Sequence, residues 1–540
     1  MRTRAVALLG ALATAAGLLS AGQSAADPRG ATAPKARAAL KWTDCATKKY
    51  PTLQCASLRV PLDHAKPDGK QISLALSRVP HTDPEHHQGP LLVNPGGPGG
   101  SGRGLAGFVA GALPRDVAAQ YDVIGFDPRG VGASRPAVDC RPGHFAPVRP
   151  DTVPIGKGVE EAGLERVKAF ANACEEKHGP LLEHLDTVSA ARDMDLIREA
   201  LGAPRINYFG YSYGTHLGAV YAKLFPQRVR RAVLDSVVDP TGVWYRDNLD
   251  QNLAFDDRHK AFAAWVARHD ATYGLGTDPA EVEGKWYAMR EAVAERPAGG
   301  KVGPAELEDA FIPGGYYNGY WPELAEAFAA YVNDENTAPL VDAYEALGVV
   351  DADGDNGYSV YAAVQCRDAP WPRSWNTWRA DNWRSHAKAP FMTWSNAWYN
   401  APCAFWPTGN LTPPDVTNSQ LPPVLLFQAT DDAATPYEGA VTLHRKLDRS
   451  SLVVEEGGGN HGVTLSGNDC LDGYLADYLA TGEVPRGRGH TPADATCDAL
   501  PEPKPEPKPE PEPEPKSAEA KRTSDVRKGL ALHGLIGRHR

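Results

Sequence analysis

Short apolar runs alternate with helix-like stretches from about Ala39 to Asp239, and the same pattern resumes near residue 424. The runs predict strands at Leu91–Asn94, Tyr121–Phe126, Ile206–Phe209, Ala232–Val237, Val424–Ala429 and Leu452–Glu455. Strands that alternate with helices are typical of a mainly parallel sheet flanked by helices. The pattern therefore predicts an α/β fold.

The pattern breaks between about Thr241 and Pro407, where apolar residues recur at helical spacing, as in Ala261–Ala267 and Leu324–Val332. Eight of the 12 tryptophans lie between Trp321 and Trp406. We interpret residues 241–407 as a helical cap inserted between two parts of the core, 41–240 and 408–498. Most clustered aromatics would form the cap's own core, and some would line a ligand cleft.

The N-terminus has the pattern of an export signal. Arg2 and Arg4 precede an apolar run from Ala5 to Leu19, and small residues end at Ala26. This predicts a signal peptide over 1–26, with 27–40 as a candidate pro-segment. The alternative, a membrane anchor, is disfavoured because the run is shorter than the roughly 20 residues that span a bilayer. No later stretch is long enough.

Because an oxidising compartment preserves disulfides, an exported chain with an even number of cysteines is expected to have them paired. The eight are Cys45, Cys55, Cys140, Cys174, Cys366, Cys403, Cys470 and Cys497. No Cys-x-x-Cys pair or Cys/His cluster has the spacing of zinc ligands, so we expect no metal. Eight cysteines allow 105 pairings, and the spacing alone does not choose among them.

The net charge of the chain bears on which partners it can bind. The chain has 56 Lys and Arg against 67 Asp and Glu, a net charge of −11, which argues against a nucleic-acid partner. We expect no cofactor.

The C-terminal end, 499–540, has the composition of a linker and a basic tail. Proline alternates with Glu or Lys from Pro501 to Pro515, which favours an extended solvated rod. Lys516–Arg540 fits a disordered tail better than a short amphipathic helix, and it is a candidate for cell-surface association. We expect neither piece to pack on the catalytic part.

Gly210-Tyr211-Ser212-Tyr213-Gly214 fits Gly-x-Ser-x-Gly, with an apolar strand before it and a helix-like stretch after it. This context is that of a nucleophile elbow, a sharp strand-to-helix turn that leaves no room for side chains at the glycines. Ser212 is therefore the predicted nucleophile.

A serine needs a base and an orienting acid, which in hydrolases of this order follow downstream. Of the later histidines, only His461 lies in a glycine-rich loop directly after a strand, so it is the predicted general base. Asp431 and Asp432 both follow the predicted strand Val424–Ala429, and this reasoning leaves the choice between them open.

A tetrahedral intermediate needs two hydrogen-bond donors for its oxyanion. The backbone N–H of Tyr213 would give the first, and Gly97 in the loop Pro95–Gly102 the second. A phosphate-binding loop is the alternative for this segment, but the Lys-Ser/Thr ending is missing. Asp351–Asp355 resembles the start of a calcium loop, but the later positions do not fit.

Four motifs together resemble the proline-iminopeptidase-type α/β-hydrolases, and most closely the secreted bacterial tripeptidyl aminopeptidases. They are Asn94–Gly102, Asp127–Ser134, Gly210–Gly214 and Asp432–Pro436, and the similarity spans about Trp42 to Cys497. The resemblance implies an α/β-hydrolase fold and makes Asp432, four residues before Pro436, the triad acid. The residue after the acid is often proline in that family and is Ala433 here. The resemblance also implies the pairs Cys45–Cys55, Cys140–Cys174, Cys366–Cys403 and Cys470–Cys497.

We therefore expect a secreted, candidate cell-wall-associated serine exopeptidase that releases tripeptides or other short peptides from substrates with a free N-terminus. A carboxylesterase or lipase with the same triad is the alternative enzyme, since the fold does not choose the acyl substrate. A surface-binding module without activity is the alternative outside enzymes. Acids of the cap should bind the substrate's amine, with Asp256, Asp257 and Asp368 among the candidates.

Overall fold

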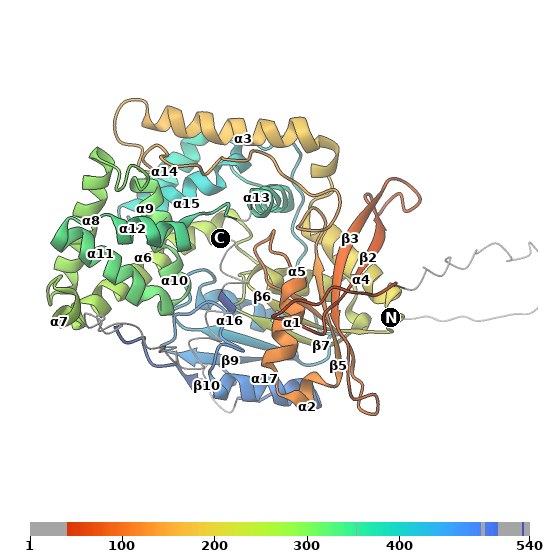
Figure 1. Ribbon diagram of the computed structural model, residues 1–540. Helices are drawn as coiled ribbons and strands as arrows, with labels where there is room; N and C mark the ends of the chain where they lie inside the picture. Colours follow the sequence, from red (N-terminus) through yellow and green to blue (C-terminus); the bar gives the residue numbers. More distant parts are fainter. Residues whose placement is uncertain (1–39, 353, 488–491, 506–531, 534–540) are drawn as a thin grey trace, which may run out of the picture. The chain divides into compact units, whose positions relative to one another are not determined.

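The computed structural model describes residues 40–352, 354–487, 492–505 and 532–533. Its centre is one ten-stranded sheet with the order β1-β2-β3-β5-β4-β6-β7-β8-β9-β10 (Figure 1). The strands are β1 (Thr43–Asp44), β2 (Gln54–Pro61), β3 (Gln71–Val79), β4 (Gly89–Asn94), β5 (Tyr121–Asp127), β6 (Ile206–Tyr211), β7 (Val229–Asp235), β8 (Val424–Ala429), β9 (Ser450–Glu456) and β10 (Ala495–Asp498). The pairs from β5 to β10 are parallel, and those among β1, β2, β3 and β5 are antiparallel.

The parallel strands are apolar without interruption because both faces of the sheet are covered. Leu92 belongs to one buried cluster, while Leu91 and Val93 belong to another on the opposite face. The helices that pack on the two faces are α1 (Arg103–Ala112), α2 (Arg115–Ala118), α4 (Thr187–Ala200), α5 (Tyr213–Leu224), α16 (Tyr437–Lys446) and α17 (Asp469–Thr481), with a 3₁₀ turn at Pro226–Arg228. The first cluster includes side chains of α4, α5 and α16, and the second includes those of α1 and α17.

The six strands expected from the sequence correspond to β4 to β9. The expected strand Ala232–Val237 runs too far, since β7 ends at Asp235 and Ser236 has a positive φ of 60°. The strands β1, β2, β3 and β10 were not expected. In β3 the buried residues alternate with partly exposed ones from Gln71 to Leu76, so the strand lacks the continuous apolar run that marks the central strands.

Helices fill the chain between β7 and β8, and among its described residues no strand joins the sheet. They are α6 (Tyr245–Arg268), α7 (Asp270–Tyr273), α8 (Pro279–Glu295), α9 (Pro304–Phe311), α10 (Pro313–Tyr316), α11 (Trp321–Asp334), α12 (Ala338–Ala343), α13 (Asn356–Asp368), α14 (Trp375–His386) and α15 (Thr393–Asn400). Shorter turns are η2 (Asn318–Tyr320), η3 (Tyr344–Gly348) and η4 (Ala401–Ala404). Most of this segment has a buried cluster of its own, which contains Trp265, Trp286 and Trp321.

A second excursion from the sheet, not expected from the sequence, lies between β5 and α4 and contains α3 (Val159–Leu182). In Figure 1, α3 runs across the top of the molecule above α14 and α15. The Trp398 indole donates to the Thr152 carbonyl at 2.7 Å, and the Arg290 guanidinium pairs with Asp151 at 2.5 Å. The cap is therefore held by this excursion as well as by the core.

Four disulfides are present: Cys45–Cys55, Cys140–Cys174, Cys366–Cys403 and Cys470–Cys497. These are the pairs that the family resemblance implies. Two of them close loops of 34 and 37 residues in the excursion and the cap, and such bridges stabilise by restricting the unfolded chain. Within residues 40–352, 354–487, 492–505 and 532–533, no helix combines the length and apolarity needed to cross a bilayer.

The C-terminal end differs from the expectation of an unattached linker and tail. Glu502 and Pro503 contact helix α6, and Leu532 and His533 are buried. An extended proline-rich chain has carbonyls that no secondary structure uses, and one of them accepts the Trp265 indole N–H. The expected signal peptide, most of the candidate pro-segment and most of the basic tail lie outside the described residues.

Candidate active site

Ser212 lies at the turn between β6 and α5 with φ 56° and ψ −128°, a strained combination for a residue with a side chain. A Cβ at Gly210 would lie 2.5 Å from the Gly214 carbonyl oxygen, so only glycine fits there. The elbow thus has the strand, turn and helix that its sequence pattern predicts. The N–H of Tyr213, the first residue of α5, has no acceptor within the helix.

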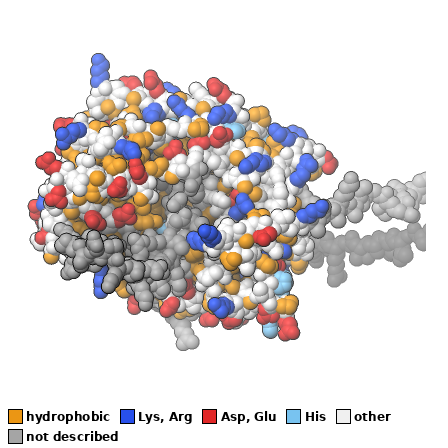
Figure 2. Space-filling model, in the orientation of Figure 1, with side chains coloured by type: hydrophobic (Ala, Val, Ile, Leu, Met, Phe, Trp, Pro, Cys, Tyr) orange, Lys and Arg blue, Asp and Glu red, His pale blue; other side chains and the backbone are white. Residues whose placement is uncertain are grey.

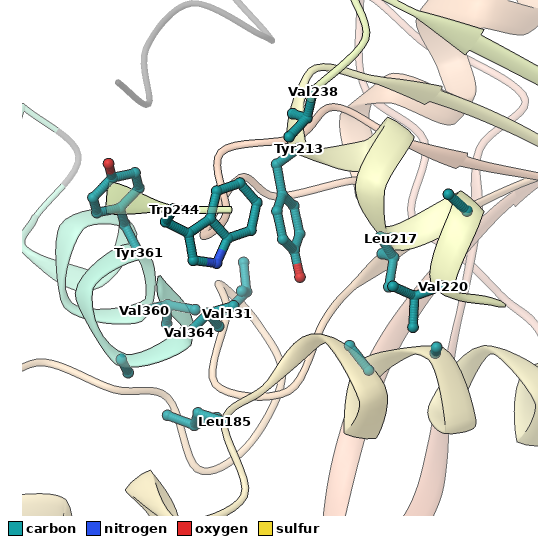
Figure 3. Close-up of a cluster of buried hydrophobic side chains, with 14 of the residues drawn as sticks. Val131, Leu185, Tyr213, Leu217, Val220, Val238, Trp244, Val360, Tyr361 and Val364 are labelled. Atoms are coloured by element: carbon teal, nitrogen blue, oxygen red, sulfur yellow. The ribbon is translucent and has the colours of Figure 1, made fainter. Parts of the chain in front are cut away.

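The elbow is also fixed by the packing of the Tyr213 ring. Figure 3 shows the ring of Tyr213 beside Trp244 and Val238 in a buried apolar cluster. The Tyr213 and Trp244 ring centroids are 5.9 Å apart, and the Tyr213 hydroxyl lies 2.8 Å from Thr187 Oγ1. Trp244 lies directly before α6, the first cap helix, so the turn at Ser212 and the start of the cap share one packed cluster.

The glycine-rich loop after β4 lies against this turn. A Cβ at Gly96 would lie 2.8 Å from Ser212 Cβ, and Gly96 has a φ of 98°. Gly97 follows with a φ of 108° and lines the same cleft as Ser212. The Ser101 hydroxyl donates to the buried Asp127 carboxylate at 2.6 Å, which ties this loop to the end of β5.

His461 and Asp432 are both buried and hydrogen-bonded to each other. His461 Nδ1 lies 3.0 and 2.9 Å from the two carboxylate oxygens of Asp432. Asp432 also accepts from the Ala434 and Thr435 N–H groups and from the Thr435 hydroxyl, so its orientation is fixed. Asp431 is exposed. Of the two aspartates, the geometry pairs Asp432 with the histidine.

The other ring nitrogen of His461, Nε2, is buried and has no hydrogen-bond partner among the described residues. No hydrogen bond between it and the Ser212 hydroxyl is present in that part of the chain. Catalytic hydrogen bonds are commonly long before substrate binds and tighten in the complex. The unpaired nitrogen leaves an acceptor for the serine proton.

Two residues that the sequence analysis missed hold the His461 loop. The buried Asp235 carboxylate at the end of β7 accepts from the Val463 and Thr464 N–H groups at 3.1 and 2.8 Å. The Ser236 hydroxyl accepts from the Gly462 N–H at 2.7 Å, and the Asp235 carbonyl accepts from the Ser212 N–H at 3.0 Å. Burial raises the pKa of Asp235 to about 6. The only sequence signal was their place at the end of an apolar strand.

A cleft of about 100 Å³ opens beside Ser212 under the cap. Its acidic residues are Asp239, Asp247, Asp250 and Glu438. Its aromatic residues are Tyr213, Trp244, Phe255, Tyr316, Tyr361 and Tyr399. Acidic side chains are also frequent on the visible face that α8, α11 and α12 build (Figure 2).

Asp247 stands out within this cleft. Its Oδ2 atom is buried without a hydrogen-bond partner among the described residues. Burial, together with the negative charges of Asp239 and Asp250, raises its pKa well above the ordinary value of an aspartate. A cation bound beside this unpaired oxygen would favour the charged form of Asp247 and offset the cost of its burial.

None of the three acids named from the sequence lines the cleft. Asp256 pairs with Lys260 at 2.5 Å, and Asp257 is exposed on the same helix. Asp368 is buried and accepts from the Thr187 N–H and hydroxyl. The tryptophans show the same difference from the expectation. Trp244 lines the cleft, whereas none of the eight tryptophans from Trp321 to Trp406 does.

Among the described residues, His81, His87 and Asp122 form the one group with enough converging side chains to consider as a metal site. Their nitrogens already bind the two carboxylate oxygens at 3.0 and 3.1 Å. The imidazole rings are stacked, with centroids 3.9 Å apart and an interplanar angle of 16°. Stacked rings do not point their in-plane lone pairs at one ion, so this group does not fit a metal.

Comparison with known proteins agrees with the site. A family profile described as the alpha/beta hydrolase fold matches residues 89–465. A tripeptidyl aminopeptidase of Streptomyces coelicolor is 46% identical over 480 residues, which cover 86% of this chain and 87% of the relative. The chain therefore belongs to the α/β-hydrolase family and, within it, to the family of the tripeptidyl aminopeptidases. The predictions of fold, family and a serine-peptidase type of enzyme are confirmed.

Two further relatives come from Mycobacterium tuberculosis. The serine protease Hip1 is 33% identical over 494 residues, covering 86% of this chain and 92% of that protein. A protein named carboxylesterase B is 34% identical over 464 residues, covering 82% of this chain and 88% of that protein. Relatives with this architecture therefore carry both peptidase and esterase names.

Proposed function

We propose that this enzyme releases tripeptides, or other short peptides, from the free N-terminus of a peptide, with Ser212, His461 and Asp432 as its catalytic triad. The observation that carries the proposal is the buried, unpaired carboxylate oxygen of Asp247 in the cleft that Ser212 lines. An esterase acting on neutral substrates has no use for such a group. A peptidase that recognises a protonated α-amine does.

The proposed reaction has two halves. His461 Nε2 takes the proton of Ser212 while Oγ attacks the scissile carbonyl, and the Gly97 and Tyr213 N–H groups stabilise the oxyanion. The imidazolium then protonates the leaving amine, the C–N bond breaks, and an acyl-enzyme remains. Water, deprotonated by His461, attacks the acyl-enzyme and frees the short peptide. Asp432 holds the imidazole through Nδ1 and stabilises its cationic form.

The acids of the cap would set the length of the released peptide. Asp247 and Asp250 lie on α6, and Asp239 lies shortly after β7, so all three line the cleft from the side of the cap root. A substrate ammonium would give Asp247 Oδ2 the partner it lacks, and a charge-assisted hydrogen bond of this kind is roughly twice as strong as a neutral one. The residues that fit between this anchor and Ser212 would then be the ones released.

The test compares an Ala-Ala-Pro anilide with a free amine and its N-acetyl form. Acetylation removes the cation and leaves the carboxylates unpaired, which should cost about 3 kcal/mol, or roughly a hundredfold in kcat/KM. Equal rates on both substrates would instead favour an open cleft, as in an endopeptidase or esterase.

A carboxylesterase remains the second candidate, because the relative of that name is 34% identical. A short-chain nitrophenyl ester distinguishes the two activities. The peptidase should hydrolyse the unblocked tripeptide anilide with the higher kcat/KM, whereas an esterase should prefer the ester and leave the anilide intact.

We also propose that the enzyme acts outside the cell. The support is the four disulfides, which persist in oxidising compartments, together with the signal-like sequence over 1–26. Attachment to the cell surface through the basic residues of 516–540 is part of this proposal. Fractionation of the producing cells, with and without a salt wash, measures both.

A further inference from the structure

The C-terminal extension begins on the cap. After β10, the chain runs toward α7 and α6, as the blue segment in Figure 1 shows. Glu502 pairs with Arg268 at 2.6 Å, and the Pro503 carbonyl accepts the Trp265 indole N–H at 3.0 Å. The proline-rich segment is therefore attached to helix α6 at its start, and it links the edge of the sheet to the cap.

Farther along the extension, Leu532 and His533 are both buried. Leu532 belongs to the same buried apolar cluster as Val463 and Leu465, which follow His461 in the chain. The His533 ring stacks on Tyr317, with centroids 4.2 Å apart and an interplanar angle of 18°. A leucine and a planar ring from the tail thus occupy a site made by the cap and the His461 loop.

That site adjoins the catalytic histidine. Tyr317 follows Tyr316, whose carbonyl accepts the His461 N–H at 2.8 Å and whose ring lies edge-on to the His461 ring. Burial, helped by the nearby His461, lowers the pKa of His533 to about 3, so His533 is held there as a neutral ring. Both of its ring nitrogens lack a hydrogen-bond partner among the described residues, a costly arrangement that favours exchange for another ligand.

The tail is separate from the acid-lined cleft. Neither Tyr317 nor His533 is among the residues that line the cleft with Ser212 and Asp247. In the reaction proposed above, His461 must deliver its proton to the amine of the departing chain, so that chain has to leave beside His461. The surface under the tail is where its first residues would lie.

We propose that Tyr317 and the His461 loop form the binding site for the departing part of the substrate, and that Leu532 and His533 of the chain's own tail compete for it. The inference rests on the proposed function, because it uses the direction in which an N-terminal peptide would lie. The site should accept a leucine-like side chain followed by a planar ring. The tail therefore inhibits cleavage of long substrates in particular.

The test uses the full-length double variant Leu532→Ser/His533→Ser, with Pro501→Ser/Lys504→Ser, two exposed residues of the same extension, as the matched control. One substrate is the peptide Ala-Ala-Pro-Leu-His-Gly, which needs the site; the other is Ala-Ala-Pro methyl ester, whose leaving group has no residue to place there. If the tail occupies the site nine-tenths of the time, kcat/KM for the peptide should rise about tenfold in the double variant. It should stay within about twofold for the ester, and in the control for both substrates.

A second variant guards against misfolding of the first. Tyr317→Ala removes the stacking surface and leaves the tail sequence intact, and an unchanged rate on the ester shows that it is folded. It should erase any preference for Leu-His over Gly-Gly after the cut. Equal changes on peptide and ester, no change on either, or a preference for Leu-His that survives in Tyr317→Ala would overturn the inference. Loss of all cleavage by the unaltered enzyme would instead contradict the proposed function.

Discussion

The carboxyl ends of the central strands and the first helix of the cap, α6, contribute to the candidate site in different ways. At the strand ends, Ser212, Asp432 and His461 follow buried parallel strands, and each is fixed by backbone geometry and hydrogen bonds. On α6, Asp247 and Asp250 lie within a helix, and burial raises the pKa of Asp247. In the proposed reaction, the residues that act on the scissile bond are held by turns after strands, whereas the acids proposed to select the substrate owe their properties to packing.

The largest effect should come from the nucleophile. Ser212→Ala should lower kcat/KM at least about ten-thousand-fold, because triad members act as a unit and only binding and oxyanion effects remain. The thermal melting curve and the four disulfides should be unchanged, since the serine hydroxyl supports no part of the fold. An active Ser212→Ala enzyme would show that Ser212 is not the nucleophile.

The next effect separates the two neighbouring aspartates. Asp432→Asn should lower kcat about a thousandfold or more, because the amide no longer selects the imidazole tautomer that accepts the serine proton. Asp431→Asn changes an exposed side chain and should alter kcat by less than about threefold. Steady-state kinetics of both variants decide the assignment, and a reversed order would show that the acid is Asp431.

The third effect concerns the cap. Asp247→Asn should lower kcat/KM for the free-amine anilide about a hundredfold, since one partner of a buried charge-assisted pair is lost. The slow rate on the N-acetyl substrate should hardly change. Asp257→Asn, an exposed acid on the same helix, is the matched control and should behave like the unaltered enzyme.

The pH dependence of KM gives the same variant a second readout. Asp247 has a raised pKa, so at low pH it is protonated and cannot pair with the ammonium; KM should fall as pH rises through that pKa. Asp239, Asp250 and Arg246 are the charged groups that shape this titration. The dependence should vanish in Asp247→Asn, and its persistence there would assign the amine site to another acid.

The candidate site residues could be chosen from the sequence because they carry local signals, and the structure places two of them, Asp432 and His461, in contact. Gly210 and Gly214 mark the elbow, and the glycines before His461 mark its loop. Asp431 and Asp432 could not be separated by pattern, since both follow β8 and only the turn decides which one faces inward. The role of Asp235 in holding the His461 loop could not be predicted, because an aspartate at the end of a buried strand has no sequence motif that marks it.

The cap could be located from the sequence but its active residues could not. Helical spacing indicated where it lies, yet Asp247 and Asp257 look alike in a polar helix. Only the tertiary packing half-buries Asp247 and leaves Asp257 exposed. The tail was misjudged for a related reason. Its proline content predicts an extended chain correctly, but not that a cap tryptophan uses one of its carbonyls.

The most direct test of the central claim is the product of a long peptide with a free N-terminus, followed by mass spectrometry. The account predicts that tripeptides or another fixed short length appear first, together with the peptide shortened by that length, and that the N-acetylated peptide stays intact. Internal cleavage, single amino acids, or equal digestion of the acetylated peptide would contradict it, because the distance from the amine anchor to Ser212 would then not set the cut.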